Sequence, residues 1–369
     1  MDQFKVVTVA AIMVLSVMAG VPIVTADSAS DTTASPTCEY PLNITDGTGT
    51  DVQLNESPEE IVVMHASAAQ VAHDIGAWDR VTGAPVQPFT AYLDNHDEPT
   101  DVTDDEGFPV VETIVDLDPD IVMAGHVGDP DTVDTLRAEN ITVYMGPMPE
   151  TVGDIKTKVY TYGELLDACD EAEERVDWMG ERLEDAEAHV EDLEESPLAY
   201  YELGDGWTTG AGTFQHDMIE RAGAENLGAA ADINGWDVVD EEVVVDMEPD
   251  FIIYDDHAEE PPVSETIRSL PVFEEDRTVA VDSNLMSQAG PRVVLMVEEM
   301  AVAFSEGTLD DAETVDTVDD SDDVADETDD DAVTAEPDEE DETDDALPAF
   351  GLLAGGIALL VALVATRRS

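Results

Sequence analysis

Three histidines and one aspartate follow short apolar runs of the sequence and carry side chains that could bind a ligand. His65 follows Ile-Val-Val-Met, His126 follows Ile-Val-Met-Ala-Gly, His257 follows Ile-Ile-Tyr-Asp-Asp, and Asp282 follows Thr-Val-Ala-Val. Imidazole and carboxylate groups are common ligands of zinc and manganese. No second histidine stands at the close spacing of a metal-binding helix. We therefore expect no metal centre, keep direct zinc or manganese binding as an alternative, and predict that His65 and His126 contact an organic ligand.

Four aromatic residues stand in loop-like segments near the ends of apolar runs. Phe89 and Tyr92 belong to the segment APVQPFTAYLDN, Trp207 belongs to the glycine-rich segment GDGWTTGAGTF, and Trp236 stands shortly before an acidic helix. Broad rings offer a large contact area at a low cost in conformational entropy, so they suit a large, flat ligand. We predict that these four residues bind the ligand together with the two histidines.

The sequence lacks the motifs of common enzymes. It contains no nucleophile elbow and no His-Glu-x-x-His motif, and its two cysteines are Cys38 and Cys169. In an oxidising exterior these cysteines are expected to form one disulfide, with two buried free thiols as the alternative. We predict a protein that is not an enzyme. An exported hydrolase and an S-layer or adhesion module are the alternatives, and the second would require β-rich repeats that the sequence does not contain.

One pattern occurs twice, as ETIVDLDPDIV from Glu112 and as EVVVDMEPDFI from Glu242, at an offset of 130 residues. Each copy begins with a glutamate, continues as an acidic helix, turns at a proline followed by an aspartate, and ends in an apolar strand. The repeat indicates two similar halves, each with an equivalent carboxylate. The structural alternative for either glutamate is a favourable interaction with the N-terminal end of its helix.

Short runs of β-branched residues alternate with helical patterns, which predicts an α/β fold with parallel strands and right-handed crossovers. From Ala172 to Leu193 apolar residues recur at spacings of four and three, which predicts one long rigid helix, with a coiled coil as the alternative. We expect two Rossmann-like lobes joined by this helix and a ligand cleft between the lobes, because ligands bind outside the carboxyl ends of such strands. The predicted strands are 61–64, 121–124, 141–144, 198–203, 251–254 and 278–281.

The charge of the chain excludes one class of function. Its 369 residues include 89 Asp and Glu but only 13 Lys and Arg, which gives a net charge of −76. Nucleic-acid binding requires the opposite sign, since phosphates are contacted by Lys and Arg. In molar salt the Debye length falls to about 3 Å, which screens the self-repulsion of such a surface. The composition is typical of a haloadapted protein.

The two ends of the chain have the composition of targeting segments. An apolar run after Lys5 is followed by Val24-Thr25-Ala26, which is typical of a secretory signal. A permanent N-terminal membrane helix is the alternative. Near the other end an acidic stretch without basic residues precedes an apolar segment and Arg367-Arg368, which predicts a disordered stalk and a membrane anchor. The predicted organisation is signal peptide 1–26, N-terminal segment 27–59, first lobe 60–150, linker with the long helix 151–197, second lobe 198–309, stalk 310–346 and anchor 347–369.

Several ordered blocks resemble the cobalamin and iron–siderophore substrate-binding proteins of ABC importers. The resemblance covers residues 60–303 and implies two α/β lobes joined by a rigid helix, with the ligand between them. The C-terminal tail resembles the archaeal PGF-CTERM sorting signal, with Pro348-Ala349-Phe350 in place of Pro-Gly-Phe. The blocks are SAAQVAHDIGAWDRVTG (67–83), VETIVDLDPDIV (111–122), WTTGAGTFQHDMIERAGAENL (207–227), VVDEEVVVDMEPDFII (238–253) and VDSNLMSQAGPRVV (281–294).

The resemblance implies specific partners. In the family one glutamate per lobe pairs with arginines of a two-fold permease, and the matching residues of the repeat are Glu112 and Glu242. The permease works with two ATPase subunits. The implied ligand is cobalamin, with a ferric siderophore or haem as the alternative, and no cofactor is expected. The implied location is outside the cell, on the outer face of the membrane of a haloadapted archaeon.

Overall fold

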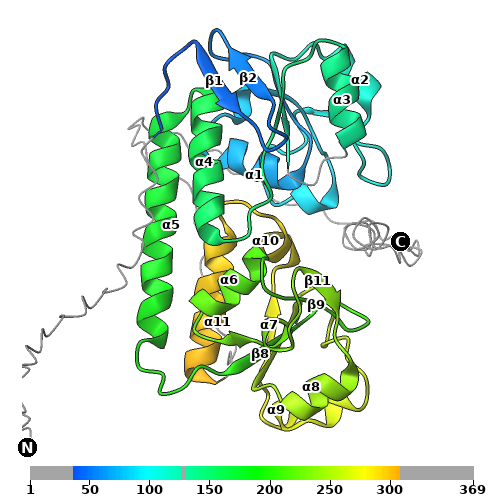
Figure 1. The fold of residues 1–369 in the computed structure, drawn as a ribbon, viewed down its shortest axis with the longest axis vertical. Coiled ribbons are helices and arrows are strands. Elements are labelled where there is room, and N and C mark those ends of the chain that lie inside the picture. The colour runs from blue at the N-terminus through cyan, green and yellow to red at the C-terminus, as the bar shows by residue number, and fades with distance from the viewer. Residues whose placement is uncertain (1–35, 126–129, 308–369) are drawn as a thin grey trace, which may run out of the picture. The chain divides into compact units, whose positions relative to one another are not determined.

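The computed structural model describes residues 36–125 and 130–307 (Figure 1). Within these ranges no helix combines the length and the apolar character needed to cross a membrane. Several predicted features lie outside the described residues, namely the signal peptide (1–26), His126, the stalk (310–346) and the apolar C-terminal segment (347–369).

The first sheet is entirely parallel and, with its helices, forms what we call the N-terminal lobe. Its central strands are runs of Ile, Val and Met whose residues are all buried, as expected for a parallel sheet covered on both faces. The strand order is β5 (Thr100–Asp101), β4 (Val81–Ala84), β3 (Ile61–Val63), β6 (Ile121–Ala124), β7 (Val143–Met145). The helices are α1 (Ala66–Asp74), α2 (Val111–Asp116) and α3 (Pro130–Ala138), with 3-10 turns η1 (Trp78–Arg80) and η2 (Pro88–Thr90).

The second sheet is also parallel and forms the C-terminal lobe. A separate two-stranded antiparallel ribbon, β9 (Trp207–Thr209) with β11 (Trp236–Val238), follows its first strand. The order of the sheet is β10 (Glu225–Asn226), β8 (Leu198–Glu202), β12 (Phe251–Asp255), β13 (Thr278–Val281). The helices are α6 (Phe214–Arg221), α7 (Leu227–Ala230), α8 (Glu241–Met247), α9 (Pro271–Glu274) and α10 (Ser283–Ser287), with the 3-10 turn η3 (Ile267–Ser269).

All six predicted strands are present, with small differences at their ends. β7 begins at Val143 rather than Ile141, because the Ile141 N–H donates to the Leu136 carbonyl and so completes the last turn of α3. The sequence did not predict β4, β5, β10 or the ribbon, which are two to four residues long. Such short pieces contain no β-branched run long enough to stand out from a loop.

The predicted long helix is α5 (Cys169–Val190), and two helices make most of its contacts. It packs against α4 (Val152–Leu166) and α11 (Val293–Glu306), so it contacts helices that precede and follow it in the chain (Figure 1). Its 22 residues correspond to about 33 Å of helix. The predicted last turn, up to Leu193, is a hydrogen-bonded turn in which the Leu193 N–H donates to Val190.

The hydrophobic core explains how this helix holds the lobes together. Ala172, Val176, Met179 and Ala186 of α5 are buried at spacings of three, four and seven residues. They belong to one continuous cluster that reaches residues of both sheets and of α1, α4, α6 and α11. Two smaller clusters fill the opposite face of each sheet. The lobes therefore share their largest hydrophobic core, which is built around α5. We call this helix the spine.

The two cysteines are bonded to each other, which confirms the predicted disulfide and excludes free thiols. The bond joins Cys38, ahead of the hairpin β1 (Leu42–Thr45) and β2 (Asp51–Leu54), to Cys169 at the start of α5. Nearby, the Tyr40 hydroxyl donates to the Glu164 carbonyl at 3.1 Å. The N-terminal segment is thus attached to the helical spine.

Candidate functional site

The internal repeat folds in the same way in both lobes, as α2–turn–β6 and α8–turn–β12. From 112 to 120 and from 242 to 250 the sequence of exposed and buried positions is identical. Ile114 and its counterpart Val244 are both fully buried. Asp118 and its counterpart Glu248 both adopt a left-handed backbone with φ of 48°. Equal burial and equal backbone angles show that the sequence repeat is a structural repeat.

The repeated aspartate after the proline has a structural role that the sequence did not reveal. Oδ2 of Asp120 accepts hydrogen bonds from the N–H groups of Glu59 (2.8 Å) and Glu60 (3.0 Å). Oδ2 of Asp250 accepts one from the N–H of Leu198 (2.8 Å). Each carboxylate thereby attaches its strand to the start of the neighbouring strand, β3 or β8. The signal that could have indicated this role is the position of each aspartate directly before a strand.

The repeated glutamates stand in the first turns of α2 and α8. Both Glu112 and Glu242 are exposed, and in the described part of the chain neither carboxylate takes part in a hydrogen bond or an ion pair. Glu241 differs, because hydrogen bonds from Ser264 and Thr266 lower the pKa of its carboxyl. Of the two adjacent glutamates on α8, it is therefore Glu242 that is available to another molecule.

Trp207 and Trp236, the two predicted ligand contacts of the C-terminal lobe, are brought together by the ribbon. Trp207 stands opposite Val238, and Trp236 stands opposite Thr209. Directly opposed residues share a face of a ribbon, and so do residues two apart. Both tryptophans and Val238 therefore lie on one face. Both rings are partly buried and Val238 is 47% exposed, so this face offers apolar area to another molecule.

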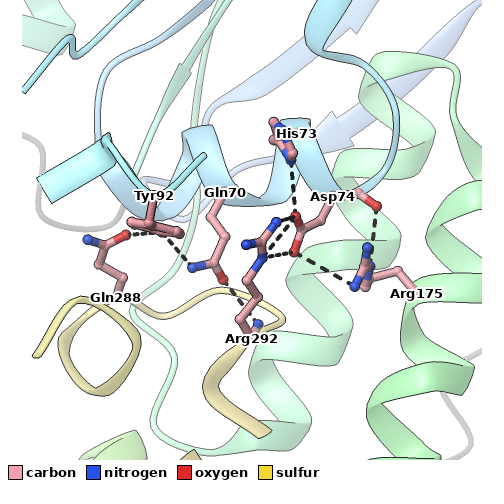
Figure 2. A network of polar contacts seen from close by, with 7 residues as sticks. All are labelled: Gln70, His73, Asp74, Tyr92, Arg175, Gln288 and Arg292. Atoms are coloured by element: carbon pink, nitrogen blue, oxygen red, sulfur yellow. Dashed lines mark hydrogen bonds and ion pairs between the residues drawn. The ribbon is translucent and has the colours of Figure 1, made fainter. Parts of the chain in front are cut away.

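Phe89 and Tyr92, from the N-terminal lobe, lie where that lobe meets the start of α11. The Tyr92 hydroxyl donates to Oε1 of Gln288 (2.6 Å) and accepts from Nε2 of Gln70 (2.7 Å) (Figure 2). Nε2 of Gln288 donates to the Phe89 carbonyl at 2.8 Å. Burial raises the pKa of Tyr92. The hydroxyl is thus engaged within the protein, and only the ring of Tyr92 remains for a ligand.

An ion-pair network continues this contact along α1. The buried carboxylate of Asp74 accepts from Arg292 (2.7 Å) and lies 4.0 Å from Arg175 of α5 (Figure 2). Burial alone would raise the pKa of Asp74, but hydrogen bonds from His73 and Arg292 and the charge of Arg175 lower it. Arg292, the residue before α11, thus forms a salt bridge with Asp74 of α1.

Two close approaches complete what we call the junction, the contact of residues 288–292 with the N-terminal lobe. Nζ of Lys158 on α4 donates to the carbonyls of Ser67 (3.3 Å) and Ala289 (2.8 Å). A Cβ atom on Gly290 would lie 2.1 Å from Oε1 of Gln70, so a side chain there would displace the Gln70 side chain from its present position. The junction therefore fixes the relative position of the lobes beside the residues predicted to bind ligand.

The predicted polar residues that the structure describes have separate environments. His65 follows β3 as the N-cap residue of α1, and its buried Nε2 has no hydrogen-bond partner among the described residues. Burial and the charge of Lys158 lower the pKa of His65 to about 4, so its ring is neutral at neutral pH. His257 is exposed, and Asp282 caps α10 by accepting from Asn284 and Leu285. Within residues 36–125 and 130–307 no group of three potential ligands could hold a metal ion.

One hollow of about 520 Å³ lies away from these residues, at the edge of the first sheet where its strands begin. None of the five predicted ligand-binding residues that the structure describes lines it. Its walls are formed by Glu60, Trp78, Asp79, Val81, Thr82, Glu98, Pro99, Thr100 and Leu117.

Comparisons with known proteins identify the family. The sequence model described as periplasmic binding protein matches residues 61–282. A protein named cobalamin-binding protein from Halobacterium salinarum is 32% identical over 289 residues, which cover 75% of this chain and 77% of that protein. An uncharacterized ABC transporter substrate-binding lipoprotein, YvrC of Bacillus subtilis, is 25% identical and covers 74% of this chain and 88% of its own.

Solved structures show the same fold at lower identity. The periplasmic vitamin B12 binding protein BtuF of Vibrio cholerae has a TM-score of 0.59 and 18% identity, covering 68% of this chain and 97% of its own. The periplasmic heme-binding protein RhuT from Roseiflexus sp. RS-1 has a TM-score of 0.58 and 19% identity, covering 68% and 99%. With its two parallel sheets, shared helical spine and this family match, the chain belongs to the periplasmic binding proteins, the non-enzymatic substrate-binding components of ABC importers.

Proposed function

We propose that this protein captures cobalamin outside the cell and delivers it to the permease of an ABC importer. The observation that carries the proposal is the 32% identity to the cobalamin-binding protein of Halobacterium salinarum, which extends over 75% of this chain and 77% of that one. The match therefore includes both lobes and the spine between them, and is not limited to one element of a widespread fold.

The residues that support a corrin ligand come from both lobes. Trp207 and Trp236 present rings on one face of the ribbon, and Phe89 and the ring of Tyr92 belong to the N-terminal lobe beside the junction. A corrin is broad and largely apolar, and aromatic side chains bind such surfaces with little loss of conformational entropy. His65 and His126 complete the proposed set, with the neutral ring of His65 supplying a polar atom.

Delivery requires a docking surface, and Glu112 and Glu242 are proposed to supply it. They occupy equivalent places in a structural repeat, which fits a permease built from two equivalent halves and served by two ATPase subunits. Bonds between a carboxylate and arginine are directional when both oxygens take part. The signal peptide, the acidic stalk and the C-terminal apolar segment are proposed to place the protein on the outer face of a membrane, and the charge of −76 suits molar salt.

The test is a ligand-binding measurement in molar salt. Purified protein is mixed with cyanocobalamin, passed through a gel-filtration column and examined by visible spectroscopy, and we expect the corrin absorbance to elute with the protein. Trp207→Ala and Trp236→Ala are each expected to weaken binding by about tenfold, because a lost aromatic contact costs on the order of 1–2 kcal/mol. Trp78→Ala is the control, since Trp78 lines the hollow at the opposite edge of the first sheet.

A ferric siderophore or haem is the second candidate, favoured by the similar fold of haem-binding proteins such as RhuT. In the same experiment, elution of a siderophore charge-transfer band or a haem Soret band with the protein, and not of corrin absorbance, would replace cobalamin by that ligand. Stoichiometric zinc or manganese in the purified protein would favour direct metal binding instead.

A further inference from the structure

Phe108 and Val238 stand just before the two copies of the internal repeat, at the same offset of 130 residues, and both expose an apolar side chain. Phe108 is 38% exposed and Val238 is 47% exposed. In the described part of the chain the only other large apolar residue exposed to this degree is Met148, which has no apolar counterpart in the repeat. Each of the pair stands four residues before the repeated glutamate of its lobe, Glu112 or Glu242.

Hydrogen bonds hold the backbone at both positions. In the first lobe Oδ1 of Asp104 accepts from the Phe108 N–H at 2.9 Å, and the Asp104 N–H donates to the Phe108 carbonyl at 2.9 Å. In the second lobe Val238 lies in β11, paired with Trp207, and the next residue, Val239, donates to the Gly206 carbonyl at 2.9 Å. The exposed side chains therefore belong to fixed segments and are not consequences of fraying.

A single exposed apolar residue is ordinary on any protein surface and needs no explanation. Here the two residues share the 130-residue offset of the repeat, and each stands four residues before an exposed carboxylate that has no partner among the described residues, on a chain with a net charge of −76. The same combination of one apolar and one anionic group is thus presented once by each lobe. A partner with two equivalent halves would contact both copies.

We propose that Phe108 and Val238 are the apolar halves of two permease-docking contacts, each packing on an apolar patch beside the cationic site that receives Glu112 or Glu242. The proposal rests on the proposed function, because it names the same permease. In protein interfaces a desolvated apolar contact supplies much of the affinity, whereas charged pairs at the rim set orientation and association rate. The glutamates would then orient the carrier, and the apolar pair would hold it on the permease.

A different role is open to the same two residues, because each is close to a predicted ligand contact. Val238 shares a ribbon face with Trp207, and a Cβ atom on Gly107, next to Phe108, would lie 3.4 Å from the Phe89 ring. Ligand affinity separates the two roles. A ligand contact changes the dissociation constant of the isolated protein, whereas a docking contact leaves it unchanged.

The first experiment compares the double variant Phe108→Ser, Val238→Ser with the control Met148→Ser in the full chain. The dissociation constant for cyanocobalamin is measured on the purified proteins, and uptake of radiolabelled cyanocobalamin is measured in cells whose own gene is replaced by each variant. We expect unchanged affinity and uptake reduced by about tenfold in the double variant only, as for loss of two interface contacts. Unchanged uptake, or a weaker dissociation constant, would overturn the proposal.

A second experiment does not depend on the ligand, so it separates failure of this proposal from failure of the proposed function. Photoreactive benzoylphenylalanine is placed at position 108, 238 or 148 of the chain in living cells, and crosslinked products are identified by mass spectrometry. Positions 108 and 238 are expected to crosslink to the same membrane permease, and position 148 is not. If cyanocobalamin fails to bind but these crosslinks form, the docking proposal is supported and cobalamin is excluded as the ligand. If 148 crosslinks equally, or if 108 and 238 capture no permease, the docking proposal is overturned.

Discussion

The phenol of Tyr92 donates a 2.6 Å hydrogen bond to Oε1 of Gln288, although 196 residues separate them in the sequence. This bond joins the segment after β4 to the segment before α11, and so links the two lobes at the junction. Because Phe89 and Tyr92 are also proposed ligand contacts, the same residues hold the lobes together and, in this proposal, contact the ligand. Their position relative to the second lobe is therefore set before any ligand arrives.

The junction should limit the relative motion of the lobes. Gln288→Ala removes the acceptor of Tyr92 and the donor to Phe89, and we expect a loss of about 1–3 kcal/mol in the free energy of unfolding, since buried groups lose their partners. Spin labels at 112 and 242, measured by double electron–electron resonance, should report a broader distance distribution than in the parent protein. Ser287→Ala, one residue earlier and exposed, is the control. An unchanged distribution would mean that the hydrogen bonds of Gln288 do not limit the motion of the lobes.

The aspartates that follow the repeated prolines should contribute to stability rather than to transport. Asp120→Ala and Asp250→Ala each leave backbone N–H groups at a strand start without their acceptor, and we expect each to lower the free energy of unfolding by about 1–2 kcal/mol. The matched controls are Asp116→Ala and Asp246→Ala, which are exposed on the preceding helices and should stay within about 0.5 kcal/mol. Denaturant unfolding in molar salt gives the free energy of unfolding of both pairs of variants. Equal losses of this free energy in the two pairs would contradict the structural role of Asp120 and Asp250.

The disulfide should stabilise the whole chain, because Cys38 and Cys169 are separated by 131 residues. Replacing both by serine is expected to cost about 2–5 kcal/mol, since the bond restricts the unfolded chain. The thermal unfolding midpoint of the double serine variant should be lower than that of the oxidised parent protein. The reduced parent protein should have the same midpoint as the variant. Reductant should not change the unfolding midpoint of the variant. A change in that midpoint would show that reductant acts on stability by a route other than the disulfide.

Lys158 should make stability depend on pH above neutrality. Burial lowers the pKa of its amine from 10.5 to about 7; the groups facing it are the carbonyls of Ser67 and Ala289, the Tyr162 ring and the neutral His65. Below pH 7 the amine is charged in both the folded and the unfolded state, and the full cost of burying the charge opposes folding. Between pH 7 and 10.5 the unfolded chain binds more protons than the folded one, so the contribution of Lys158 to stability rises with pH.

The comparison that isolates this effect is the parent protein against Lys158→Met. From pH 7 to pH 9 the difference in the free energy of unfolding should change by about 2–3 kcal/mol in favour of the parent, at 1.36 kcal/mol per pH unit. Thermal melts in molar salt at several pH values measure this difference. A difference that stays constant over this range, or that moves in favour of the variant, would show that the amine remains charged inside the protein.

The docking glutamates should affect uptake without affecting ligand binding. Charge reversal at both, Glu112→Lys with Glu242→Lys, replaces attraction to cationic sites by repulsion, and uptake of radiolabelled ligand should fall by at least about tenfold. The dissociation constant of the purified protein should not change. Asp116→Lys with Asp246→Lys places the same charges one turn later on the same helices and is expected to retain most of the uptake. Weaker ligand binding in the glutamate variant would assign these residues to the ligand site instead.

How much the sequence reveals depends on whether the determining interaction is local. The strands 121–124 and 278–281 were predicted residue by residue, because a β-branched apolar run between turns has few other stable conformations. The spine was predicted for the same reason, since its apolar spacing of three and four residues matches one face of a helix. The disulfide could be predicted because the sequence contains two cysteines and has the features of an exported protein.

The candidate site was predicted less completely, because its contacts join distant segments. No local pattern around Tyr92 indicates that its hydroxyl is bonded to Gln288, and nothing near Trp207 indicates that a ribbon pairs it with Val238. The repeat was visible in the sequence, but it contains several matching acidic residues. Only the contacts distinguish Asp120, which anchors a neighbouring strand, from Glu112, which has no partner among the described residues.

Each copy of the repeat is closed by a bond to the strand beside it, Asp120 to the start of β3 and Asp250 to the start of β8. The two copies are therefore separate modules, whose internal geometry does not depend on each other. Substitutions in one copy can therefore change the affinity of that lobe for the proposed permease without changing the affinity of the other lobe. A carrier with near two-fold architecture can consequently become asymmetric, with a high affinity of one lobe and a low affinity of the other for the two halves of the proposed permease.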